Sequence, residues 1–79
     1  MGIYTNIICV APLKCCGKKV TDWQSKSLMV KINHVEIPVE HRLKEYSISL
    51  FSSGSISAWC SACSQMTRYN IEDGKAVEE

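Results

Sequence analysis

Five cysteines in a chain of 79 residues constrain this fold more than any other feature of the sequence. A chain of this length buries only about 60 to 65% of the surface that its unfolded form exposes, so its core is small and often needs a cross-link. Because five is an odd number, the cysteines cannot all pair as disulfides within one chain. The odd count therefore disfavours a fold built only from internal disulfides.

The sequence also lacks recognisable targeting segments. Its longest apolar run, residues 7–13, contains Pro12 and is far shorter than the roughly 20 residues of a membrane-spanning helix. The first residues have neither the basic segment nor the cleavage site of a secretory signal. We therefore expect no membrane association and a reducing cytoplasmic setting, where clustered cysteines more often bind metal than form disulfides.

Composition and residue patterns predict one small β-rich domain over residues 1–79. Hydrophobic residues make up 46% of the chain and charged residues 22%, which excludes a disordered tail and a highly basic nucleic-acid-binding arm. Alternating and β-branched residues predict strands, and one stretch of helix formers predicts a short helix. The expected elements are strands at residues 2–10, 21–26 and 28–32, a helix at 39–46, a hairpin at 48–58 turning at 52–55, and a last hairpin at 67–77 turning at Asp73-Gly74.

The clearest chemical signal is the Cys60-Ser61-Ala62-Cys63 segment. Two thiolates at this spacing converge on one ion from a tight turn, and a tetrahedral zinc ion needs four such ligands, usually two from each of two loops. Cys16-Gly17 resembles the second half of a Cys-x-x-Cys-Gly knuckle, but the position three residues before Cys16 is Leu13, which cannot bind metal. The remaining ligand is therefore Cys15 or Cys9.

Neither Cys15 nor Cys9 has the usual Cys-x-x-Cys spacing from Cys16. Adjacent side chains point to opposite sides of an extended backbone, so Cys15 and Cys16 can reach one ion only from a sharply folded loop. Cys9 lies in an apolar strand, where a cysteine is commonly a small core residue. We predict a structural zinc site of Cys15, Cys16, Cys60 and Cys63, with Cys9 as the replacement for Cys15; His34 and His41 are reserve ligands.

The sequence gives no indication of catalysis. No serine or cysteine has the sequence context of an activated nucleophile, and the carboxylates are scattered without a motif. A site filled by four cysteines leaves no coordination position for water or substrate. We therefore expect a non-enzymatic protein; a thiol oxidoreductase would instead require an exposed, low-pKa cysteine in the Cys60–Cys63 pair.

Charge gives an alternative function. Residues 14–31 contain five lysines against the single acid Asp22, although the whole chain carries only +1. A basic edge with an aromatic residue can contact phosphates and stack a base, which makes a weak nucleic-acid-binding zinc ribbon the alternative. Its contact residues would be Lys14, Lys18, Lys19, Trp23 and Lys26. A tryptophan in so small a fold is, however, more often part of the core.

Four segments together resemble a group of small uncharacterised zinc-ribbon proteins of tailed bacteriophages and prophages. These are Met1-Gly2-Ile3-Tyr4, the cysteine loop at residues 13–20, Asp22-Trp23-Gln24-Ser25-Lys26 and Cys60-Ser61-Ala62-Cys63. The chain departs from the group's pattern where Cys15-Cys16-Gly17 contracts the first knuckle and Ser64 replaces the glycine of the second. The resemblance implies zinc-ribbon-like antiparallel hairpins, between all-β and α+β in class. It also implies an accessory protein of host takeover or counter-defence type, which engages a host or phage protein in the bacterial cytoplasm.

Overall fold

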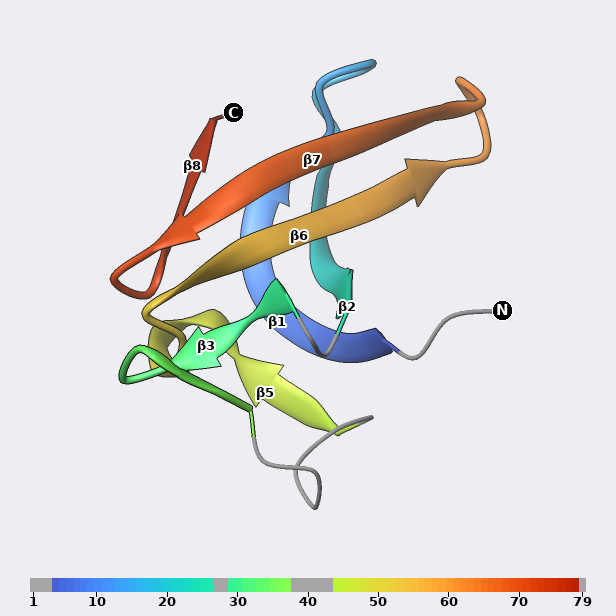
Figure 1. Ribbon diagram of the computed structural model, residues 1–79. Helices are drawn as coiled ribbons and strands as arrows, with labels where there is room; N and C mark the ends of the chain where they lie inside the picture. The colour runs from blue at the N-terminus through green and yellow to red at the C-terminus, as the bar shows by residue number, and fades with distance from the viewer. Residues whose placement is uncertain (1–3, 27–28, 38–43, 79) are drawn as a thin grey trace.

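The computed structural model describes residues 4–26, 29–37 and 44–78. Eight strands in these segments form one curled antiparallel-dominated sheet, and Figure 1 shows how the later strands cross the earlier ones. The strands are β1 (Tyr4–Pro12), β2 (Lys19–Lys26), β3 (Lys31–Ile32), β4 (Val35–Glu36), β5 (Glu45–Ser47), β6 (Ser53–Cys60), β7 (Gln65–Glu72) and β8 (Lys75–Glu78). The molecule is therefore β-rich, as the sequence predicts.

Two long hairpins, β1–β2 and β6–β7, form most of the sheet. Each is antiparallel along its length, and the β6–β7 ladder is unbroken from Ser53↔Glu72 to Cys60↔Gln65. Between the two hairpins, the described residues contribute one ladder pair, Gln24↔Ser57. In Figure 1, β6 and β7 accordingly run across β1 and β2 at a steep angle rather than beside them.

The core lies on the inner face of this curled sheet. Trp23 has none of its surface exposed, and its ring meets Tyr69 edge-on with centroids 5.4 Å apart. The Trp23 indole N–H donates to the Val20 carbonyl, so its polar atom is satisfied within the fold. The interpretation of Trp23 as a core residue is confirmed. Apolar residues of the strands and of the segments between them complete the core. Ile7, Ile56 and Ile71 belong to strands, and Val30, Ile37 and Phe51 belong to connecting segments.

Several predicted elements match the structure. The first two strands are β1 and β2, and the last hairpin is β7–β8, whose turn contains Asp73 and Gly74, both with positive φ. Asp-Gly suits this turn because both residue types tolerate the left-handed backbone region. Of the strand expected at residues 28–32, the structure has β3 at Lys31–Ile32, while residue 28 lies outside the described segments.

The predicted helix at residues 39–46 falls largely outside the described residues. At its end, however, Glu45 and Tyr46 belong to β5, which pairs in parallel with residues 6–8 of β1. Tyr46 also meets the Phe51 ring edge-on at 5.9 Å. The prediction is therefore wrong for Glu45 and Tyr46. A short helix has little stability of its own, and sheet pairing with core packing outweighs local propensity here.

The predicted hairpin at residues 48–58 is wrong in its first strand and in its turn, whereas residues 56–58 of its second strand do belong to β6. Ile48–Leu50 is a short 3-10 helix rather than a strand, and residues 53–55, expected in the turn, begin β6. Gly54 explains the difference, because a Cβ there would lie 2.6 Å from Val30 Cγ1. The glycine thus permits close approach of the Val30 segment instead of reversing the chain. The real partner of β6 is β7, reached through the turn that contains Cys63.

None of the helices found in residues 4–26, 29–37 and 44–78 has the length and apolar character needed to cross a membrane.

Candidate metal centre

The loop between β1 and β2 folds sharply enough to turn two adjacent cysteines toward one point. The Gly17 N–H donates to the Leu13 carbonyl at 2.7 Å, and the Leu13 N–H donates to the Lys18 carbonyl at 2.8 Å. Gly17 has a φ of +75°, a backbone conformation that glycine adopts without the steric cost of a Cβ. This compact turn meets the geometric condition that the adjacent pair Cys15 and Cys16 requires.

Contacts with β7 anchor the same loop. The Lys14 N–H donates to Thr67 Oγ1 at 2.9 Å, and the Tyr69 hydroxyl donates to the Pro12 carbonyl at 2.9 Å. The Lys14 ammonium also lies 5.0 Å from the centre of the Tyr69 ring, within the range of a cation–π contact. Because Thr67 and Tyr69 are buried side chains of β7, the first cysteine loop has a fixed position relative to the second hairpin.

The turn between β6 and β7 supplies the other two cysteines. Cys60 is the last residue of β6 and is buried, while Cys63 lies in the four-residue turn that leads to Gln65. Ser64 has a φ of +53° and completes the reversal. This position is where a zinc knuckle usually has glycine, so the serine here accepts a left-handed backbone conformation that non-glycine residues seldom adopt.

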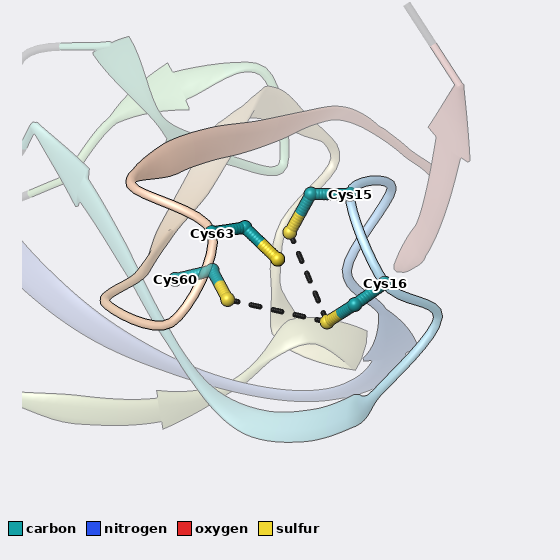
Figure 2. Close-up of side chains that lie close together, drawn as sticks. All are labelled: Cys15, Cys16, Cys60 and Cys63. Carbon is teal, nitrogen blue, oxygen red and sulfur yellow. Dashed lines mark hydrogen bonds between the residues drawn. The ribbon is translucent and has the colours of Figure 1, made fainter.

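The two turns bring four sulfur atoms together. The Sγ atoms of Cys15, Cys16, Cys60 and Cys63 all lie within 4.8 Å of one another, and Figure 2 shows them converging from both turns. Cys16 Sγ lies 3.8 Å from Cys15 Sγ and 4.0 Å from Cys60 Sγ. A tetrahedron with zinc–sulfur bonds of about 2.3 Å has sulfur–sulfur edges of about 3.8 Å. The cluster can therefore hold a metal ion of this size with little rearrangement.

Interactions within the cluster separate the thiol pKa values. The Cys63 backbone N–H hydrogen bond, followed by the Cys15 side chain, lowers the pKa of Cys60 to about 7. Burial, followed by hydrogen bonds with Cys63, Cys60 and Cys16, raises the pKa of Cys15 to about 12. For Cys63, a hydrogen bond with Cys15 acts to lower the pKa, but interaction with Cys60 and burial outweigh it and the pKa rises. Four thiols this close cannot all ionise without a cation.

The replacement ligand and the reserve ligands lie elsewhere or outside the described residues. Cys9 is 7% exposed within the core of β1, burial raises its pKa, and it is not part of the four-sulfur cluster. The four-sulfur cluster is therefore formed by Cys15 and not by Cys9. His34 is exposed in the turn between β3 and β4 and is likewise outside the cluster, and His41 lies outside the described residues.

The basic residues predicted to contact nucleic acid do not form one patch with an aromatic ring. Lys14, Lys18, Lys19 and Lys26 are exposed, but Trp23 is buried and cannot stack on a base, so that assignment is corrected. Lys19 and Lys26 stand at opposite ends of β2, about 20 Å apart along the strand. The exposed aromatic side chains that the sequence interpretation missed are Tyr4 and Trp59, which are 46% and 59% exposed.

Sequence reasoning also missed the anchors of the cysteine loop. Thr67 and Tyr69 alternate on the inward side of the last long strand, and this alternation was the available signal that both are buried. Their roles as hydrogen-bond partners of a loop more than 50 residues away depend on tertiary structure. Comparisons of the chain with protein-family models, curated proteins and solved structures find no significant match.

Proposed function

We propose that this protein is a non-enzymatic binding module stabilised by a structural zinc ion at Cys15, Cys16, Cys60 and Cys63. The observation that carries the proposal is the convergence of the four Sγ atoms within 4.8 Å. Soft thiolate ligands in a tetrahedral arrangement favour zinc over magnesium or calcium, which prefer oxygen. Four protein ligands fill a tetrahedral zinc ion, so the proposed role of the metal is structural.

The energetic effect of such an ion supports a structural role. Structural zinc contributes roughly 10 to 16 kcal/mol of binding free energy, whereas a domain of this length has a net stability of only about 4 to 12 kcal/mol. The ion would join the β1–β2 loop to the β6–β7 turn, which belong to different hairpins. We base the proposed similarity to zinc ribbons on these two cysteine-containing turns, which would bind one ion between them.

For the biological role, we propose a phage or prophage accessory protein that engages a host or phage protein in the bacterial cytoplasm. The sequence resemblance described above supports this role, and the closed cysteine site is consistent with binding rather than catalysis. Capture of a defined partner from bacterial lysate by the tagged protein, lost on competition with untagged protein, is the expected result. Failure to retain any protein specifically would contradict the role without bearing on the metal.

The metal proposal has its own test. Native mass spectrometry of protein purified without chelator should show one zinc ion per chain, and a variant with Cys60 and Cys63 both changed to Ser should carry none. The matched control is Cys9→Ser, which alters a cysteine outside the cluster and should retain one ion. Wild-type protein that is purified without chelator, is folded, contains no metal and takes up none when zinc is added would refute the structural-zinc assignment.

A further inference from the structure

A hollow on the outer face of the sheet opens where β2 and β6 diverge. The described parts of these strands share one ladder pair, Gln24↔Ser57, and the Ser25 hydroxyl donates to the Ser55 carbonyl beside it. Next to this hydrogen bond, β2 and β6 border a hollow of about 480 Å³, a volume in the usual range of small-ligand sites. The steep crossing of β2 and β6 in Figure 1 accounts for this opening.

Strand register places the lining side chains on one outer face. Gln24 and Lys26 alternate with buried residues of β2, and Lys26 stands opposite Tyr4 of β1. Arg68 of β7 stands opposite Ser57 of β6. Because side chains alternate along strands, and paired residues share a face, all of these side chains point away from the core. Four strands therefore contribute to one surface site.

The charge of the hollow favours an anion. Lys26 and Arg68 are the charged residues that line it, and both are cations. Neither forms an ion pair with another residue of the described segments. Ser55 and Ser57 of β6 are small residues that supply hydroxyl groups without filling the space. A phosphate group could thus approach two cations that have no ion-pair partner among the described residues, and one of them is an arginine suited to bidentate phosphate contacts.

Exposed aromatic rings flank the Gln24–Ser57 pair on both sides. Tyr4 lines the larger hollow and is 46% exposed. A second hollow of about 300 Å³ shares Gln24 and Ser57 and is lined by Trp59, which is 59% exposed. The second hollow also contains Asp22, whose charge disfavours a phosphate at that end. The larger hollow therefore combines two cations with the Tyr4 ring, and the second hollow combines the Trp59 ring with an acid.

From this arrangement we propose that the outer face of β1, β2, β6 and β7 binds single-stranded nucleic acid. Lys26 and Arg68 contact backbone phosphates, and Tyr4 and Trp59 stack on bases. Stacking on exposed aromatic rings beside cations is the general mode of single-strand binding. An acidic peptide would use the two cations but would leave Trp59 beside Asp22 without a role. The surface excludes Lys18, and it involves none of the four cysteines, so it is a site additional to the metal centre.

Fluorescence anisotropy with a labelled 12-nucleotide oligo(dT) tests the proposal on the full chain purified without chelator. Two phosphate contacts predict that the logarithm of the affinity falls with the logarithm of salt concentration with a slope of about −1.4. Arg68→Ala should reduce the magnitude of this slope by about 0.7. Trp59→Ala should weaken binding by about 5- to 150-fold, and Trp59→Tyr, which keeps a ring, should restore most of the loss.

Lys18→Ala is the matched control, because it removes one exposed lysine from the cysteine loop and leaves the outer face intact. Its affinity should equal that of wild type, and circular dichroism should show all variants folded. The proposal is overturned if the oligonucleotide does not bind, or if Lys18→Ala weakens binding as much as Arg68→Ala. It is also overturned if Trp59→Ala has no effect, or if poly-glutamate competes as effectively as unlabelled oligo(dT), since the last result would assign the face to acidic peptides.

Discussion

Substitution of Cys16 by serine separates the contribution of the proposed metal from that of core packing. Cys16 is the exposed member of the four-sulfur cluster, so its replacement leaves no cavity in the core. Surface substitutions usually change stability by no more than about 0.5 kcal/mol. The metal-free Cys16→Ser protein should therefore unfold at nearly the same denaturant concentration as the metal-free wild type.

In the presence of zinc the same substitution should have a large effect. If a binding free energy of roughly 10 to 16 kcal/mol is shared among four thiolates, each contributes about 2.5 to 4 kcal/mol. Loss of the Cys16 thiolate should then weaken zinc binding by about 70- to 900-fold. The expected signature is a stability difference between Cys16→Ser and wild type that appears when zinc is added and disappears when it is chelated.

Competition with a chromophoric chelator measures the zinc affinity, and urea unfolding followed by tryptophan fluorescence measures stability with and without metal. Cys9→Ser is the control, because Cys9 is buried outside the cluster. A hydroxyl placed in this apolar site should cost about 1 to 3 kcal/mol with or without zinc, and zinc affinity should not change. Equal zinc affinity of Cys16→Ser and wild type, or a comparable loss in Cys9→Ser, would refute the assigned ligand set.

Three further predictions concern protons, the core and one turn. In chelator competition, zinc affinity should rise as the pH increases from 6 to 9. The metal must displace the thiol proton of Cys15, whose pKa is raised to about 12. Below pH 7 it must also displace the thiol proton of Cys60, whose pKa is lowered to about 7. Trp23→Ala should reduce the free energy of unfolding by about 3 to 5 kcal/mol in urea denaturation, since Trp23 is completely buried. Gly54→Ala should lower the thermal midpoint through a cost of about 1 to 3 kcal/mol, because its Cβ would overlap Val30.

The cysteine cluster illustrates how much of the site the sequence could indicate. The Cys60–Cys63 spacing predicts a convergent pair by itself, because the two residues share one turn. The choice between Cys15 and Cys9 could not be made in this way, since it depends on whether residues 13–18 fold into a tight loop. That loop is closed by backbone hydrogen bonds and by contacts with Thr67 and Tyr69, which are remote in sequence.

The fold shows the same division between local and tertiary information. Asp73-Gly74 specifies its hairpin because the turn conformation is a property of those two residues. Residues 52–55 carry an equally turn-like composition, yet β6 begins at Ser53 and Gly54 fits against Val30. A glycine that permits close packing and a glycine that reverses the chain have the same local sequence signature, so only the tertiary neighbours distinguish them.

The single ladder pair between the two long hairpins connects the metal centre with the outer face. The shape of the two hollows beside Gln24↔Ser57 depends on how β2 and β6 cross. The proposed zinc ion would join the loop that precedes β2 to the turn that follows β6, and so would restrict this crossing at one end. A ligand that spans both hollows would restrict it at the middle. Because coupling free energies are reciprocal, any increase in oligonucleotide affinity caused by zinc must be matched by an equal increase in zinc affinity caused by the oligonucleotide.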